Sequence, residues 1–97
     1  MAHHVLKTDP EVFQKSWDGD KPWEIRRNDR GFKKSDTLTL RETKFSGQEM
    51  KSGKPLSYTG REIECEVKLV VDSCSGAYGL SDNWVVMTVE ETALKFN

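Results

Sequence analysis

The chain of 97 residues has few of the residues that commonly mark a metal or redox site. It contains only two cysteines, Cys65 and Cys74, which lie nine residues apart with no second pair. Structural zinc sites use four ligands at short, regular spacings, and this spacing is missing here. Two cysteines could form one disulfide, but nothing else in the sequence indicates secretion. We therefore expect a reduced, cytoplasmic protein with no metal and no cofactor.

Long apolar runs and an excess of charge of one sign are also absent. No segment has the length and hydrophobicity of a signal peptide or a membrane span, so we expect no membrane partner. Fifteen basic and 16 acidic residues give a formal net charge of −1. Any contact with nucleic acid must therefore come from a local patch rather than from a broad basic surface. The sequence has no P-loop and no Ser–His–Asp ordering.

The length and the patterning indicate one small domain that spans residues 1–97. A chain this short buries only about two-thirds of the surface that it exposes when unfolded. Three Trp, four Phe and two Tyr supply large side chains for a single core. Trp23 and Trp84 are assigned to that core, although either ring could stack on a base.

Short stretches of alternating apolar and polar residues predict five strands. Before the second strand, Pro10 favours the start of a short helix over residues 10–18, with Thr8 or Asp9 as its cap, and Gly19 ends it. Residues 43–60 are polar and rich in glycine, which predicts a long hairpin loop, and the tail after residue 92 is expected to fray. Five short strands with one early helix indicate an α+β domain with a small, curved, partly closed sheet. The predicted strands span residues 4–7, 22–27, 37–42, 61–72 and 83–91.

The strand predicted at residues 61–72 alternates most clearly. One face carries carboxylates and a lysine and is expected to be solvated, although three carboxylates could also bind a metal. The other face is expected to be buried, with Cys65 as an inert thiol. The polar face consists of Glu62, Glu64, Glu66 and Lys68, and the apolar face of Ile63, Cys65, Val67, Leu69 and Val71.

The strand at residues 22–27 has an apolar-leaning face and an ionic face. Trp23, Ile25 and Arg27 point one way, and Glu24 and Arg26 point the other. The charged side chains can converge with Lys21, which lies in the turn before the strand. Arginine offers a planar fork to phosphate, lysine a point charge, and glutamate an acceptor for the amino group of a base. The alternative is an internal ion-pair network that closes the barrel.

The segment Gly19-x-Lys21-x-x-Glu24-x-Arg26, directly after the predicted helix, resembles the signature of the ASCH domains. These domains are relatives of the PUA domain, which is found in RNA-modifying enzymes. Within this group the chain is similar to a small set of uncharacterised bacterial and phage proteins. The similarity begins at His4-x-Leu6-Lys7 and continues through residues 24–32, 36–42, 58–61 and 78–80.

This resemblance implies a PUA-like β-barrel with one or two short helices and a cleft beside the helix-to-strand turn. The cleft would bind RNA or a nucleotide-like ligand through Lys21, Glu24 and Arg26. Rim contacts are expected from Arg27, Arg30 and Arg61, with Tyr58 and Tyr78 as stacking platforms near the mouth. The sequence of residues 28–31 is also typical of a tight turn. His4 is expected to be a structural histidine.

Some relatives with a similar fold hydrolyse acylated cytidine with a motif lysine and a threonine. Glu24 occupies the position of that threonine, so we expect a binding module without this hydrolysis. The alternative is an amidohydrolase that acts on a modified nucleoside, with Lys21 and Glu24 as its catalytic residues. A third possibility is a protein-interaction module of phage origin.

Overall fold

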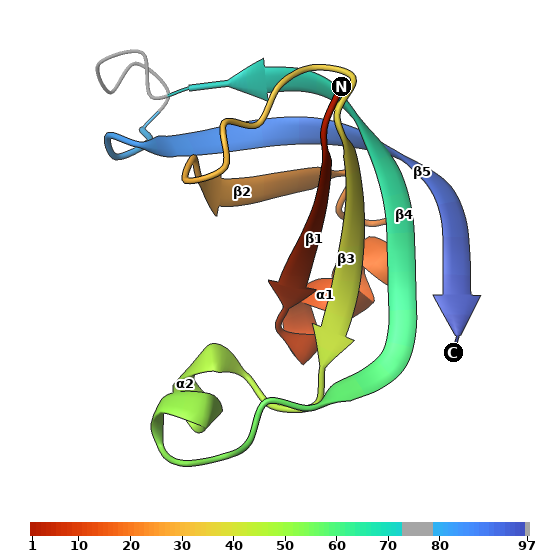
Figure 1. Cartoon of the computed structure of the whole chain (residues 1–97), viewed down its shortest axis with the longest axis vertical. Helices are drawn as coiled ribbons and strands as arrows, with labels where there is room; N and C mark the ends of the chain where they lie inside the picture. The colour runs from red at the N-terminus through yellow and green to blue at the C-terminus, as the bar shows by residue number, and fades with distance from the viewer. Residues whose placement is uncertain (73–78, 97) are drawn as a thin grey trace.

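The computed structural model describes residues 1–72 and 79–96. Five strands and two short helices follow one another in this part of the chain (Figure 1). The predicted residues Cys74 and Tyr78 lie outside the described residues. The elements are β1 (His3–Thr8), α1 (Pro10–Trp17), β2 (Trp23–Arg27), β3 (Thr37–Thr43), α2 (Gly47–Lys51), β4 (Tyr58–Val71) and β5 (Trp84–Phe96).

The strands form one mixed sheet in the order β1-β3-β4-β5-β2. β1 and β3 run parallel, and the remaining neighbours are antiparallel. The long strands β4 and β5 bend strongly, and their register shifts between Glu64 and Cys65 and again between Val67 and Leu69 (Figure 1). Bulges of this kind increase local curvature. The result confirms the predicted α+β domain with a small, partly closed five-stranded sheet.

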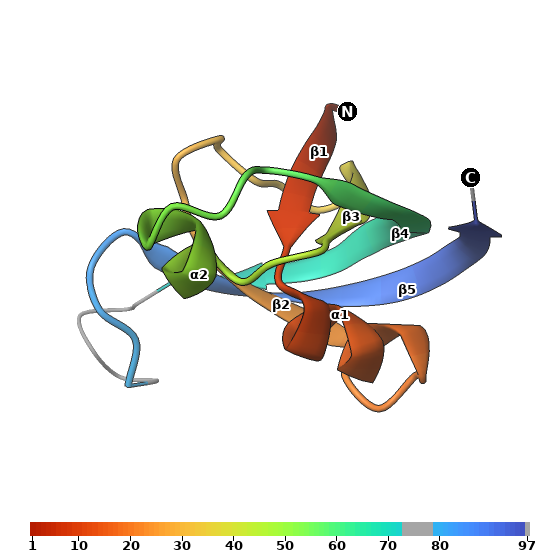
Figure 2. The ribbon, with the colours of Figure 1, turned by 90° about the horizontal axis from the view of Figure 1, so that it is seen from below.

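The hydrophobic core lies inside this curved sheet and beneath α1. Leu38 and Leu40 from β3 and Ile63, Cys65 and Val67 from β4 are all buried, as the alternation predicted. The helix contributes Phe13, which is fully buried, and α1 contacts β3. The second helix, α2, supplies no residue to this core, although the amide of Gly47 at its start donates to Asp9 Oδ1, just before α1 (Figure 2).

The prediction that Leu69 is buried is wrong. Val67 pairs with Val89, but the next pair along the ladder joins Leu69 to Thr88, so Lys68 is an extra residue in β4. One extra residue reverses the direction of every side chain that follows it. Leu69 is therefore 51% exposed, and Val70 packs against the core instead.

The assignment of Trp23 to the core is also wrong. Trp23 and Ile25 are 41% and 47% exposed, whereas Glu24 between them is 2% exposed. β2 therefore turns its ionic face inward and its apolar face outward. Trp84, the other predicted core tryptophan, is only partly buried, and the guanidinium of Arg27 lies 5.6 Å from its ring centre.

Two segments contain more regular structure than the sequence pattern predicted. Within the predicted loop, α2 begins with a capping box: the Ser46 hydroxyl accepts from the Glu49 amide, and the Glu49 carboxylate accepts from the Ser46 amide. As far as the structure describes it, the tail is not frayed: β5 continues to Phe96, which pairs with Arg61. The capping box is visible in the sequence as Ser-x-x-Glu, whereas the pairing of the tail depends on a distant strand.

Candidate functional site

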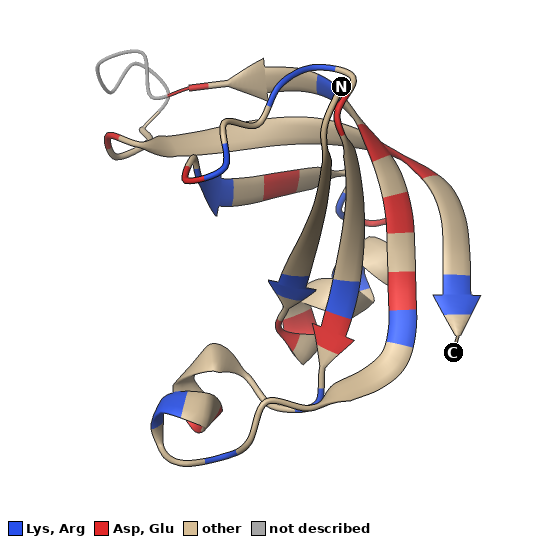
Figure 3. Cartoon of the chain, viewed as in Figure 1, with Lys and Arg blue, Asp and Glu red and all other residues tan. Residues whose placement is uncertain are grey.

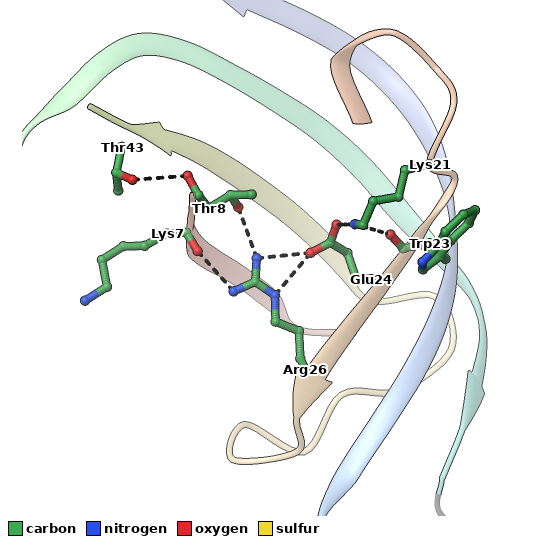
Figure 4. A network of polar contacts seen from close by, with 7 residues as sticks. All are labelled: Lys7, Thr8, Lys21, Trp23, Glu24, Arg26 and Thr43. Carbon is green, nitrogen blue, oxygen red and sulfur yellow. Dashed lines mark hydrogen bonds and ion pairs between the residues drawn. The ribbon is translucent and has the colours of Figure 1, made fainter. Parts of the chain in front are cut away.

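The turn between α1 and β2 places Lys21 against the start of the strand. Gly19 has a positive φ of 81°, and the amides of Asp20 and Lys21 both donate to the carbonyl of Lys15. The chain therefore reverses sharply at the end of the helix. From this position the Lys21 ammonium donates to the carbonyl oxygen of Trp23 over 2.7 Å and to Glu24 Oε2 over 2.8 Å (Figure 4).

Glu24 is held between two cations inside the curved sheet. Its Oε2 accepts from Lys21 and its Oε1 accepts from Arg26 Nε over 3.1 Å, so both carboxylate oxygens are engaged. The side chains of Lys21, Glu24 and Arg26 are 14%, 2% and 24% exposed. The structure thus brings together the three residues at the centre of the predicted site. Two partners offset the cost of burying the carboxylate.

Arg26 also connects β2 to β1, the strand at the opposite edge of the sheet. Its Nη1 donates to the carbonyl oxygen of Lys7 and its Nη2 donates to Thr8 Oγ1, both over 3.0 Å (Figure 4). In the turn after β2, Arg30 Nη1 donates to the carbonyl oxygen of Val5 over 2.9 Å. The predicted alternative, an ion-pair network that closes the barrel, therefore also describes this geometry.

A cavity of about 540 Å³ lies between β1, β2 and the start of α1. Its apolar lining includes Leu6 and Phe32 from the core and the more exposed Val12, Ile25 and Trp84. Around these residues, five basic side chains face three acidic ones. The basic residues of the lining are Lys7, Lys21, Arg26, Arg27 and Arg30, and the acidic ones are Asp9, Glu24 and Asp29.

The five basic side chains of this lining differ in whether a carboxylate already pairs with them. Lys21 and Arg26 share Glu24, whereas Lys7, Arg27 and Arg30 have no carboxylate within salt-bridge distance in the described part of the chain. Sequence reasoning missed Lys7 as a site residue, because it belongs to no charged motif. Its position on an edge strand beside Arg26 is a consequence of the sheet topology alone.

Two residues of the predicted rim lie elsewhere. Arg61 forms an ion pair with Glu42 at 2.7 Å, and its guanidinium lies 4.8 Å from the ring centre of Trp17. The hydrogen bond from Arg61 lowers the pKa of the Glu42 carboxyl. Tyr58 lies under the guanidinium of Arg41, at 3.6 Å from the ring centre. Neither Arg61 nor Tyr58 lines the cavity.

A second buried polar cluster has a structural role. The carboxylate of Asp36 accepts from the amides of Ala2 and Lys33, and His4 Nε2 lies 2.9 Å from its Oδ2. These bonds, led by that from Ala2, lower the pKa of Asp36 to about 2. The His4 ring packs edge-on against Phe32, with 4.8 Å between the ring centres. The cluster ties the start of β1 to the turn before β3.

The acidic face of β4 and the free thiol show no sign of a reactive site. Figure 3 shows acidic residues at alternate positions along β4. They are paired: Glu62 with Arg41 at 3.0 Å, Glu66 with Lys68 at 2.6 Å, and Glu64 with a threonine hydroxyl. Burial raises the pKa of the Cys65 thiol to about 12, which keeps it protonated.

Over residues 1–72 and 79–96, no group of three or more His, Cys, Asp or Glu side chains is placed to hold a metal ion. Neither helix in that part is long and apolar enough to cross a membrane.

Comparison with known proteins gives a family but no activity. A search of curated proteins finds no match to the sequence. Residues 3–89 match the model of a family described as a domain of unknown function, DUF3850. The match includes β1, β2 and the start of α1, between which the cavity lies. Because the match extends over most of its length, the chain belongs to the DUF3850 family.

Proposed function

We propose that this protein binds a nucleotide-like ligand, or a short segment of RNA, in the cavity between β1 and β2. The observation that carries the proposal is the set of three cations without carboxylate partners, Lys7, Arg27 and Arg30, beside an apolar wall. A phosphate requires cationic donors, and a base requires an apolar or aromatic surface. The cavity of about 540 Å³ also falls within the usual range for small-molecule sites.

The lining divides into groups with different roles. Lys7, Arg27 and Arg30 contact the phosphate, and Arg30 keeps part of its fork free because only its Nη1 bonds to Val5. Ile25 and Trp84 provide the surface against which the base packs. A rigid wall of the cavity is formed by Lys21, Glu24 and Arg26. Their polar groups already bond to one another and to main-chain carbonyl oxygens of the protein.

The charge distribution favours a small ligand over a long RNA. Asp9 and Asp29 lie in the same lining and interrupt the basic patch. The whole chain carries a formal net charge of −1. A long polyanion would therefore meet repulsion from these carboxylates, whereas one or two phosphates contact only the basic side chains.

The resemblance of the Gly19-x-Lys21-x-x-Glu24-x-Arg26 segment to the ASCH domains supports the same ligand class. In those relatives the cleft beside the helix-to-strand turn is thought to hold a nucleotide or RNA. The resemblance implies a PUA-like barrel as well, which is compatible with the curved sheet described above. The resemblance supports the proposal only in combination with the three cations that have no carboxylate partner.

An NMR chemical-shift screen of nucleosides, nucleotides and short RNAs tests the proposal. We expect shifts that cluster at Lys7, Arg27 and Trp84, and we expect nucleotides to bind more tightly than the matching nucleosides. Replacing Lys7 with alanine should weaken nucleotide binding, whereas Lys51→Ala, at an exposed lysine of α2, should leave it unchanged. The absence of shifts at the cavity for every compound, at millimolar concentration, would exclude the proposed function.

A further inference from the structure

The outer face of β2 carries a row of side chains that begins at the cavity between β1 and β2. Arg27, Ile25 and Trp23 occupy alternate positions of the strand, and the ring of Trp23 points away from the buried Glu24 (Figure 4). Arg27 and Ile25 line the cavity, whereas Trp23 does not. Alternate residues of a strand are about 7 Å apart. The row therefore leads from a cation, past an apolar side chain, to an exposed aromatic ring just outside the cavity.

The apolar part of this row continues across the sheet from β2 to β4. Val85 and Met87 of β5 are buried, so Val86 and Thr88 face outward beside β2. Side chains directly opposite each other in paired strands lie on the same face. A contiguous apolar patch on a protein surface marks a binding site far more often than single exposed residues do. Two rows across the strands make up the patch, Trp23–Thr88–Leu69 and Ile25–Val86–Val71.

Carboxylates bound this patch on the side away from Arg27. Glu90 follows Thr88 at the next outward position of β5, and its side chain is 66% exposed. Glu66 lies opposite Glu90 on β4. Lys68 contacts both carboxylates, at 2.6 Å and 3.9 Å, but one lysine cannot neutralise two glutamates. A nucleic acid that extended past Trp23 in this direction would therefore be repelled.

An exposed aromatic ring beside cations is the kind of surface on which single-stranded nucleic acids bind. Their unstacked bases lie on aromatic rings, while basic side chains contact the phosphates. The spacing of about 7 Å between Ile25 and Trp23 is roughly twice the distance between stacked bases, so two bases can lie side by side on them. The Lys21 ammonium, 6.0 Å from the ring centre of Trp23, adds positive charge at the same place.

We propose that the ligand is a single-stranded RNA segment of two nucleotides, with the first base in the cavity and the second base stacked on Trp23. The proposal rests on the proposed function, because it extends the nucleotide in the cavity by one residue. The end phosphate and the first base keep the contacts assigned to them above. Glu90 sets the length, since a third nucleotide would meet its carboxylate.

The dinucleotides pApA and ApAp, which carry the end phosphate at opposite ends, test the proposal against adenosine 5′- and 3′-monophosphate. One dinucleotide should bind at least fivefold more tightly than its matching mononucleotide, the lower limit for stacking one base on an aromatic ring. Trp23→Ala should remove this gain and change mononucleotide binding less than twofold. Phe96→Ala, at an aromatic residue that is 75% exposed at the far end of β5, should change neither affinity.

NMR of the wild-type protein gives a second measurement that needs no variant. The indole N–H resonance of Trp84, which lines the cavity, should shift with mononucleotides and dinucleotides alike. The indole resonance of Trp23 should shift only with the dinucleotide. Adding a third nucleotide should change the affinity less than twofold.

The outcomes separate this inference from the proposed function. Equal affinities for mononucleotides and dinucleotides, or a gain that persists in Trp23→Ala, would overturn the inference and leave the cavity as a nucleotide site. An unshifted Trp23 indole in the dinucleotide complex would do the same. Failure of every mononucleotide and dinucleotide to bind would exclude the proposed function, and the inference with it.

Discussion

The guanidinium of Arg26 donates to the main-chain carbonyl oxygen of Lys7 across 3.0 Å and so joins the two edge strands of the sheet. Edge strands expose carbonyl and amide groups that would otherwise pair with another chain. Here the carbonyls of Lys7 and Val5 accept from arginines instead. Because Arg26 also bonds to the buried Glu24, one side chain closes the sheet and forms a wall of the cavity.

Replacing Arg26 with methionine should destabilise the protein by about 3 kcal/mol, because Glu24 would remain buried with only Lys21 as a partner. Arg30→Met is the matched control, since it removes a single hydrogen bond to a carbonyl and should cost about 1 kcal/mol. Urea unfolding of the two variants measures the difference. Equal, small losses would mean that Arg26 does not bridge the edges in solution.

The bulge in β4 gives a second prediction. Val67→Asp places a charge among fully buried side chains and should prevent folding. Leu69→Asp, only two residues away, should cost less than about 1 kcal/mol because Leu69 points to solvent. Circular dichroism and thermal melting distinguish the two variants. A folded Val67→Asp protein, or an unfolded Leu69→Asp protein, would show that the register of β4 is wrong.

The strands themselves could be predicted from the sequence, because alternation is a local property. The apolar residues that β3 and β4 bury up to Val67 follow directly from it. The exposure of Leu69 could not be predicted, because a bulge forms where two strands disagree in curvature, and no single residue in β4 signals it. In contrast, α2 has a local signal in Ser46 and Glu49 that the glycine-rich surroundings concealed.

The candidate site was predictable only in part for the same reason. Lys21, Glu24 and Arg26 are close in sequence, so their convergence follows from one turn and one strand. Hydropathy alone does not predict that these three side chains are buried and Trp23 is exposed, because it assigns the apolar face of a strand to the core. Their burial depends on the Lys7 carbonyl and the Thr8 hydroxyl of β1, a strand that is distant in sequence, as partners for Arg26. Lys7 enters the site through the same long-range contact.

The low pKa of Asp36 predicts acid sensitivity. Hydrogen bonds from Ala2, His4 and Lys33 lower it from 3.8 to about 2 in the folded protein. A carboxyl with a depressed folded-state pKa stabilises the protein above its unfolded pKa, and this contribution is lost as pH falls from about 4 to 2. The loss should be about 1–2 kcal/mol.

The Asp36→Asn variant isolates this effect. It should be less stable than the wild type at pH 6, and the difference between the two proteins should narrow as pH falls below 4. Chemical unfolding at several pH values measures it. A constant difference from pH 6 to pH 2 would mean that Asp36 is not the titrating group.

Binding to a short single-stranded RNA should depend weakly on salt. Three phosphate contacts, from Lys7, Arg27 and Arg30, predict a slope of about −2 in a plot of log affinity against log salt concentration. Arg27→Ala should make this slope shallower by about 0.7, whereas Lys51→Ala should not change it. A slope of about −8 would indicate a wide basic surface and would contradict a small cavity as the site.

The final prediction separates binding from hydrolysis. We expect the wild-type protein to release no acid from an acylated cytidine, measured by NMR over several hours. The proposed resemblance to the ASCH domains places Glu24 where the amidohydrolases of that group have a threonine, and Lys21 and Arg26 already engage both oxygens of Glu24. Lys21→Ala removes a partner of a buried carboxylate, so it should lower stability as well as alter the wall of the cavity. It must therefore be compared with Glu24→Gln at a temperature where both are folded. Release of acid by the wild type that disappears in both variants, and persists in Lys51→Ala, would establish an amidohydrolase in place of a binding module.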